Sequence, residues 1–288
     1  MRLSFLDSIT DAGLAERPNE DTFATSGNRA FVIDGATGLG NQQVMTGHGS
    51  DARWLAHFAR DCFVALSDLP VAHVVRETNR RAHEAVREAE KGRPLEAWAL
   101  PVAGFQMIAV EENQIVTYGL GDCRLFILSR SDGATFHTSA LKENYAAERE
   151  RARLAIERTG GLAKHASLSR APSVQRELRE GRARYNTPGG PIWTLGTAPG
   201  AADHVLRETV PYSGNVTGLL CTDGFAALCD QYGLYDVAGL ITAAHERGLA
   251  PLLEELRHLE RVRDPDGRAF PRYKVSDDAT ALLFEVLA

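Results

Sequence analysis

Short apolar runs and segments with helical spacing alternate in blocks along this chain. The runs are bounded by turn residues such as Gly, Asp and Asn, which is the pattern of β-strands separated by turns. Because the turns between the three middle runs are short, we expect those strands to form an antiparallel meander. The predicted strands are residues 2–9, 29–33, 102–110, 114–118, 124–129, 218–222 and 279–286.

Helical periodicity marks two segments after the second strand and two near the C-terminus. In the first, apolar residues from Trp54 to Leu66 recur at intervals of three and four, and Ser50 is the expected N-cap. The second, residues 71–89, has one apolar and one charged face, which is typical of a helix on a protein surface. The C-terminal pair is predicted at residues 237–247 and 251–261.

Residues 141–184 differ from the rest of the chain because they are strongly charged. Residues 149–184 hold nine arginines, and the helical pattern is broken near Gly160 and Pro172. Since glutamates are interspersed among the arginines, we interpret this stretch as a solvated helical excursion. The alternative is a basic lid or docking surface for a negatively charged partner.

The order of the elements predicts the fold class. Strands lie early, in the middle and at the end of the chain, with helices in pairs between them, which favours an α+β fold built in layers. No internal repeat and no Pro/Gly/Ser-rich linker divides the chain. We therefore expect residues 1–288 to form a single domain, with a basic helical excursion at about residues 141–184.

Composition narrows the classes of function. With 44% hydrophobic residues the 288-residue chain is too apolar to be disordered throughout, and its net charge of −6 argues against a nucleic-acid partner. No apolar run is long enough for a membrane helix, and the N-terminus does not resemble a secretory signal. The four cysteines form no Cys-x-x-Cys pair, which predicts reduced thiols in a cytoplasmic protein.

Acidic residues stand beside the apolar runs at five places. Strand ends can gather such residues in one cleft, where clustered carboxylates stay ionised together only if cations neutralise them. Oxygen ligands favour hard ions such as Mg²⁺ or Mn²⁺. Asp-Gly is also an ordinary turn signal. From spacing alone, two interpretations therefore remain: a metal site, or a set of ordinary turns. The five places are Glu20–Asp21, Asp34, Asp122, Asp223 and Asp277–Asp278.

The motifs around these residues occur in a recognisable order. They read RPNED at residues 17–21, FVIDG at 31–35, GLGDCR at 119–124, LLCTDGF at 219–225 and DDAT at 277–280. Each motif is short, but the ordered set spans nearly the whole chain. It resembles the metal-dependent Ser/Thr protein phosphatases of the PPM (PP2C) family, in a divergent branch of the bacterial type.

The resemblance implies a four-layer α-β-β-α sandwich, in which two antiparallel sheets are flanked by helices and two Mn²⁺ or Mg²⁺ ions lie at one end. It implies that Asp34 bridges both ions. The Gly35 carbonyl and Glu20 would serve one ion, and Asp223 and Asp277 the other.

The remaining site residues also follow from the resemblance. Asp122 matches a position that helps to hold a third, weaker ion in bacterial relatives, and Asp21 would orient metal-bound water. Arg17 would grip the phosphate. The implied reaction is direct hydrolysis of phosphoserine or phosphothreonine by hydroxide held between the ions. The implied partners are a phosphorylated protein substrate and a Ser/Thr kinase as its counterpart, with no nucleic acid and no membrane.

Three departures from the family pattern bear on substrate handling. The position where many relatives have the phosphate-binding Arg is Glu16 here, and Arg17 follows it. Residues 36–40 lack the His that often comes after the Asp-Gly of the second motif. Asp278 stands where the family usually has Asn, so Asp277 is the better ligand candidate.

Two alternative functions therefore remain open beside the protein phosphatase. The missing His and the displaced Arg favour a phosphatase with the same centre but a small phosphomonoester as substrate. The basic stretch at residues 149–184 would suit a non-catalytic module that binds or senses a phosphoprotein. Retention of the acidic motifs argues against the second alternative, because a pure binding module has no need of crowded carboxylates.

Overall fold

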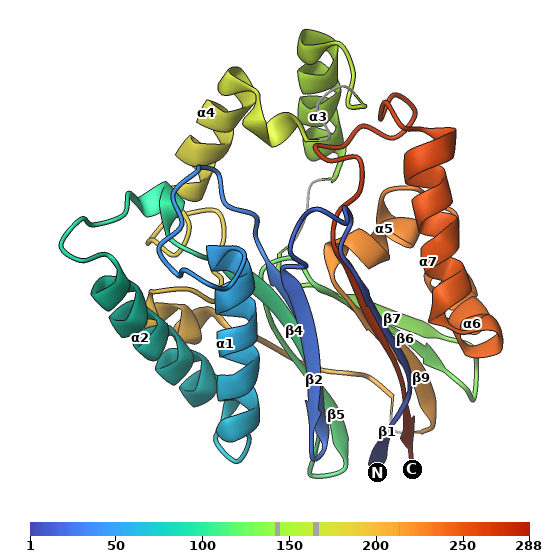
Figure 1. Ribbon diagram of the computed structural model, residues 1–288. Coiled ribbons are helices and arrows are strands. Elements are labelled where there is room, and N and C mark those ends of the chain that lie inside the picture. The colour runs from blue at the N-terminus through green and yellow to red at the C-terminus, as the bar shows by residue number, and fades with distance from the viewer. Residues whose placement is uncertain (142–144, 164–166, 213) are drawn as a thin grey trace.

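Two antiparallel sheets stack face to face in the computed structural model, which describes residues 1–141, 145–163, 167–212 and 214–288 (Figure 1). One sheet has the strand order β1-β10-β9-β6-β7 and the other β2-β3-β4-β5-β8. The strands of the first are β1 (Arg2–Asp11), β10 (Ala279–Leu287), β9 (Val216–Cys221), β6 (Arg124–Ser129) and β7 (Thr135–Thr138). Those of the second are β2 (Asp21–Ser26), β3 (Arg29–Gly35), β4 (Ala103–Glu111), β5 (Gln114–Leu120) and β8 (Leu206–Thr209).

Helices cover the outer face of each sheet, so the predicted four-layer α-β-β-α sandwich is confirmed. On one side α1 (Asp51–Ala65) packs on β2, β3 and β4, and α2 (Val71–Ala89) packs beside α1 in the same hydrophobic cluster. On the other, α5 (Asp223–Asp230), α6 (Val237–Arg247) and α7 (Leu249–His258) pack on β9 and β10. Helix α7 continues into the short π-helical turn η4 (Leu259–Arg263).

The alternation of residues along each strand builds this layering. In β3, Phe31 and Ile33 join the cluster formed with α1 and α2, whereas Val32 faces the opposite sheet. In β9, Leu219 packs under α5 to α7 and Leu220 lies between the sheets. Because successive side chains of a strand point to opposite faces, a fully apolar strand supplies both of its neighbouring layers.

The predicted meander is wrong in its third strand. Strands β4 and β5 pair as an antiparallel hairpin, but β6 belongs to the other sheet. The chain crosses between the sheets at Gly121, whose φ of +79° is a conformation that favours glycine. The crossing leaves Asp122 at the end of the sandwich rather than in a hairpin turn.

The charged stretch forms two helices above the same end of the sandwich. Helix α3 (Tyr145–Thr159) ends before Gly160, and α4 (Pro172–Arg182) starts with Pro172 at its first turn, so both predicted breaks are confirmed. A short turn, η2 (Leu168–Arg170), precedes α4. From there the chain passes through η3 (Pro199–His204) into β8.

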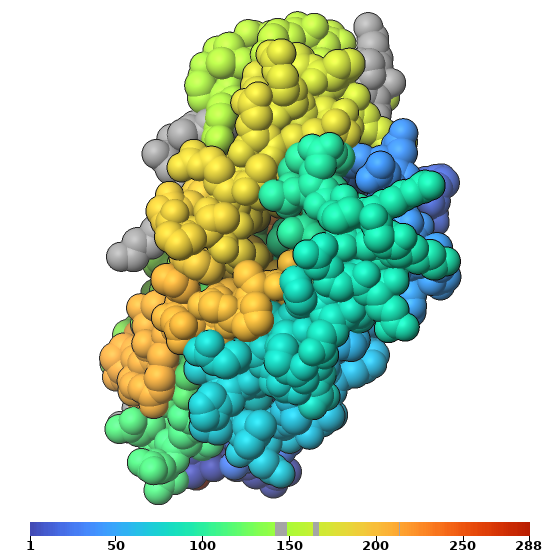
Figure 2. Space-filling model, turned by 90° about the vertical axis from the view of Figure 1, so that its left-hand side faces the viewer, coloured from blue at the N-terminus to red at the C-terminus, as the bar shows by residue number. Residues whose placement is uncertain are grey.

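Figure 2 shows the segment from α4 to η3 lying against α2 and the loop that contains η1 (Ala97–Ala99). Asn79 of α2 holds this segment, since its side chain donates to Ala198 O (2.8 Å) and accepts from Gly196 N (3.0 Å). Trp193 stacks on His204 with ring centres 3.7 Å apart and helps to anchor this segment. Among the described residues, no helix combines the length and apolarity needed to span a bilayer.

Candidate metal centre

Three carboxylates are brought together by the sheet that contains β2 and β3. Asp21 begins β2 and pairs directly with Asp34 of β3, which in turn lies opposite Gly104 of β4. A Cβ atom on Gly104 would lie 2.9 Å from Asp122 Oδ1, so only glycine at this position lets Asp122 approach Asp34. The sheet register therefore sets the positions of these side chains.

The second sheet contributes carboxylates from the opposite side. Asp223 is the first residue of α5, directly after β9, and its side chain hydrogen-bonds Asp34. Thr222 Oγ1 donates to Asp21 Oδ2 (2.7 Å) and accepts from Thr280 N (2.9 Å), so a buried hydroxyl links the two sheets. The short helix after Asp223 was not predicted, because Asp223–Gly224 has the form of a turn.

Glu20 is held by hydroxyl groups of the loop between β3 and α1. Thr37 and Ser50 each donate to its carboxylate at 2.5 Å, and Ser50 also accepts from Arg53 N as the predicted N-cap of α1. Gly35 N donates to Glu20 O (3.1 Å), which brings the backbone of the second predicted ligand beside the first.

Asp277 and Asp278 have different surroundings. The Asp278 carboxylate accepts the backbone N–H of Glu20 (2.7 Å) and of Gly13 (3.2 Å), so it fixes the loop before β2. Both residues line the cavity described below, but the Asp277 side chain is 36% exposed and contacts Lys274 instead of the loop before β2. This difference favours Asp277 over Asp278 as a ligand.

Not all predicted ligands lie at ligand distance from one another. The described residues contain one group of three potential ligands whose donor atoms all lie within 4.8 Å: Asp34, Asp122 and Cys123. Glu20 and Asp277 are outside this group and are engaged by donors of the chain itself. Cys123 is buried in the core between the sheets, and burial raises the pKa of its thiol well above the usual range, so it stays a neutral core residue.

The carboxyl groups of the cluster have raised pKa values, because they are buried and their negative charges are crowded together. Burial, with the negative charges of Asp21 and Asp223, raises the pKa of Asp34 well above its usual range. Burial and Asp278 do the same to the pKa of Asp21. Desolvation, with the negative charges of Asp277 and Asp122, raises the pKa of Asp223 to about 8, although Asp223 itself is exposed at the surface. An oxygen-only donor set of this kind fits hard divalent ions.

Basic side chains approach the same site. Lys274 Nζ contacts Asp277 Oδ1 at 2.5 Å, and Arg182 at the end of α4 donates to Ala36 O (3.5 Å) with its guanidinium over Tyr185. Sequence reasoning missed both, because each lies in a segment that shows no motif and reaches the site only through tertiary structure. Arg17, the predicted phosphate-gripping residue, lies in the wall of the cavity.

A cavity of about 340 Å³ opens over this cluster. Its wall combines Glu20, Asp277 and Asp278 with the loop of residues 36–43, the η1 segment and α4. Trp98 forms part of it, with the Arg179 guanidinium stacked 3.9 Å from its ring centre. The cavity therefore has a charged floor and a partly aromatic side wall. Its principal charged residues are Arg17, Glu20, Arg182, Lys274 and Asp277.

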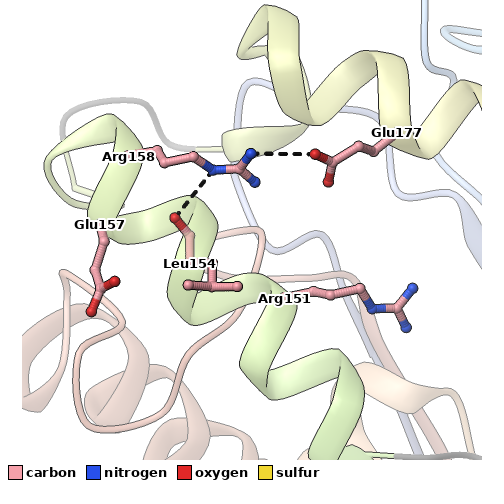
Figure 3. Close-up of a pocket in the computed structure, with 5 residues that line it drawn as sticks. All are labelled: Arg151, Leu154, Glu157, Arg158 and Glu177. Carbon is pink, nitrogen blue, oxygen red and sulfur yellow. Dashed lines mark hydrogen bonds and ion pairs between the residues drawn. The ribbon is translucent and has the colours of Figure 1, made fainter.

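A larger hollow of about 460 Å³ lies elsewhere, between α3 and α4 (Figure 3). Arg158 Nη1 pairs with Glu177 across it (3.3 Å), and Leu154 provides an apolar wall. The Arg158 and Glu177 side chains are about half exposed, so they form an ordinary surface ion pair.

Comparison with solved structures identifies the fold. The catalytic domain of the Ser/Thr protein phosphatase PstP, solved with two manganese ions, matches with a TM-score of 0.56 and 17% identity over 99% of both chains. PppA of Pseudomonas aeruginosa matches with 0.54 and 17%, over 99% of this chain and 97% of that one. The PPM phosphatase MsPP of Mycobacterium smegmatis, solved with cacodylate, matches with 0.53 and 18%, over 99% and 100%.

The chain thus has the fold of the bacterial PPM Ser/Thr phosphatases along its whole length. No protein-family model matches the sequence, and no curated protein matches it either. At identities of this size the likeness shows the fold alone, so the chemistry has to be argued from the residues of the site.

Proposed function

We propose that this chain is a metal-dependent phosphatase that hydrolyses phosphoserine and phosphothreonine in proteins. The observation that carries the proposal is the meeting of Asp21, Asp34, Asp122 and Asp223 from both sheets, beside a cavity lined by Glu20, Asp277 and Asp278. A structural role alone does not explain it, because crowded carboxylates destabilise a fold unless cations bind them.

The donor set fits Mn²⁺ or Mg²⁺. Asp34, Asp223, Asp277, Glu20 and the Gly35 carbonyl would hold two ions, and Asp122 would take part in a third position. When bound, such ions neutralise the phosphoryl oxygens and lower the pKa of water, which supplies the nucleophile.

The other residues of the chain bind and orient the substrate in this proposal. Arg17 and Arg182 both line the cavity and can each donate to phosphoryl oxygens. Asp21, held by Thr222, accepts a hydrogen bond from the attacking water and fixes its direction. Trp98 lies in the wall of the cavity, where it would contact the residues that flank the phosphorylated side chain of a protein substrate supplied by a Ser/Thr kinase.

The test is hydrolysis of an aryl phosphate and of phosphopeptides with Mn²⁺, with Mg²⁺ and with chelator. We expect metal-dependent turnover that falls at least 100-fold in Asp34→Asn, since this residue lies at the centre of the cluster. Asp203→Asn is the matched control, because Asp203 forms only a surface ion pair with Arg76. Full activity in Asp34→Asn would refute the site assignment, and preference for small metabolites over peptides would refute the substrate class.

One observation favours a second candidate, a non-catalytic module that binds a phosphoprotein. The carboxylates of Glu20 and Asp277 are already engaged by donors of the chain itself, as a site without catalytic ions would require. Such a module would bind phosphopeptides without turning them over. Robust metal-dependent hydrolysis in the assay above would exclude it.

A further inference from the structure

Lys274 is the one side chain in the described part of the centre that brings an ammonium group among the carboxylates. Its Nζ donates to Asp277 Oδ1 (2.5 Å) and to Thr37 Oγ1 (3.1 Å). Thr37 in turn donates to Glu20 Oε2 (2.5 Å). A continuous chain of hydrogen bonds therefore runs from Asp277 through Lys274 and Thr37 to Glu20.

The backbone around Lys274 holds this contact in place. Lys274 forms an isolated β-bridge with Ser167, and Leu168 N donates to Tyr273 O (2.7 Å). On the N-terminal side, Arg272 is buried and donates to Asp264 Oδ2 (2.9 Å) and to Asp264 O (2.6 Å). The lysine thus comes from a segment held by the β-bridge with Ser167 and by the buried Arg272, and its side chain is only 22% exposed.

The two halves of the carboxylate cluster differ in charge balance. The largest charge effects on Asp34 come from Asp21 and Asp223, which are both acidic. Asp277, by contrast, has an ammonium group in direct contact. A divalent ion bound to Asp277 would have to displace Lys274 or lie next to it, and a positive charge a few ångströms away disfavours the ion strongly.

We propose that Lys274 is a built-in counter-ion of the centre, which neutralises Asp277 and thereby weakens the binding of the second divalent ion. The inference rests on the proposed function in assuming that the carboxylates bind such ions. The half of the cluster around Asp34 then binds one ion tightly. The ion on the Asp277 side binds only weakly, so its occupancy depends on the free metal concentration.

Mn²⁺ titration by calorimetry tests the proposal without relying on activity. We expect the full-length wild-type chain to bind one Mn²⁺ tightly and a second weakly. In Lys274→Met, a neutral variant of similar length, the second Mn²⁺ should bind on the order of tenfold more tightly or better. Spin coupling between two neighbouring Mn²⁺ ions, seen by electron paramagnetic resonance, should appear at lower metal concentration than in wild type.

Two further variants make the test specific. Arg170→Met removes a positive charge from the wall of the same cavity and should leave both affinities within about twofold of wild type. Asp277→Asn should abolish the increase in second-ion affinity caused by Lys274→Met. The double variant Lys274→Met/Asp277→Asn should therefore bind the second Mn²⁺ no better than Asp277→Asn alone. Lys274→Ala, together with thermal unfolding of every variant, shows whether a lost contact rather than a lost charge is responsible.

The outcomes separate this inference from the proposed function. Equal second-ion affinity in wild type and Lys274→Met would overturn the inference, even if both bind Mn²⁺ and hydrolyse phosphate esters. An effect of Lys274→Met on inhibition by inorganic phosphate alone would also overturn it, because the lysine would then contact substrate. Absence of Mn²⁺ binding in every folded variant would refute the metal centre itself.

Discussion

Arg182 shows how a single residue can supply a function that the motif region lacks. It reaches the cavity from the end of α4, and burial lowers the pKa of its guanidinium, while Asp122 and Glu20 favour its charged form. An arginine remains protonated under such conditions. In the proposed function, a phosphoryl group would bind between the carboxylate cluster and this guanidinium, which would then contact the phosphoryl oxygens.

Replacing Arg182 should therefore impair substrate binding more than metal binding. We expect Arg182→Met to raise KM for a phosphopeptide about 10- to 100-fold, because a hydrogen bond to a charged group contributes about 1.5–3 kcal/mol. Steady-state kinetics with Mn²⁺ at saturation measures this. Arg176→Met is the control, since Arg176 is exposed on the same helix. An unchanged KM in Arg182→Met would mean that Arg182 does not bind the phosphate and that Arg17 is the remaining candidate.

At the scale of the element, the position of Asp122 depends on how closely β4 approaches the crossing after β5. A methyl group on Gly104 would meet Asp122 Oδ1 at 2.9 Å and the backbone of Asp122 and Leu120 at 3.4 Å. The side chain of Asp122 can turn away more easily than the backbone can move. The strand should survive, and the ligand should be displaced.

Gly104→Ala is accordingly expected to weaken Mn²⁺ binding roughly tenfold or more, as mispositioned ligands do, with a loss of about 1–3 kcal/mol in stability. Calorimetry and urea unfolding measure the two effects. Gly200→Ala serves as the control, because a Cβ atom there meets no heavy atom within 4 Å. Normal metal affinity in Gly104→Ala would show that Asp122 takes no part in the centre.

The elements also show what the sequence could and could not predict. Apolar runs and helical spacing located β3, β9, β10, α1 and α2, because burial of those segments follows directly from their side chains. The strand β6 was placed in the wrong sheet, since a Gly-Asp turn looks the same whether it closes a hairpin or crosses between sheets. Short elements such as α5 and β8 form because of tertiary packing, so the local sequence pattern does not indicate them.

The candidate site divides in the same way. The carboxylates were predictable because they stand next to strands and recur in ordered motifs. The basic residues were not, because Lys274 and Arg182 come from segments that meet the motifs only in the folded chain. Lys274 and Arg182, which are distant from the motifs in sequence, are what make the site differ from a cluster of carboxylates alone.

At the scale of the whole molecule, the centre lies where the two sheets meet, so its charge state acts on the stability of the entire sandwich. The bond from Thr222 to Asp21 joins the sheets directly beside Asp34. Folding therefore forces carboxylates from both sheets together. The free energy needed to do this depends on whether protons or cations neutralise them.

The metal-free protein should consequently lose stability as the pH rises. Burial in the cluster raises the pKa of Asp223 to about 8, from an ordinary value of 3.8, and raises that of Asp34 as well. The folded chain then binds more protons than the unfolded chain between these values, so the free energy of unfolding falls from about pH 5 to about pH 8. The lowered pKa of His57, caused mainly by burial, acts in the opposite direction near pH 6 and is common to all variants.

Thermal unfolding at several pH values, with chelator and with Mn²⁺, tests this prediction. Because bound ions require deprotonated carboxylates, the rise in Tm caused by Mn²⁺ should grow with pH up to about 8. Asp223→Asn should flatten the pH dependence of the chelated protein relative to wild type, whereas Asp203→Asn should leave it unchanged. The prediction fails if, with chelator, the wild-type protein and Asp223→Asn are equally stable at every pH. Asp223 would then not be crowded by other carboxylates in solution, and the electrostatic argument for a metal centre would fail.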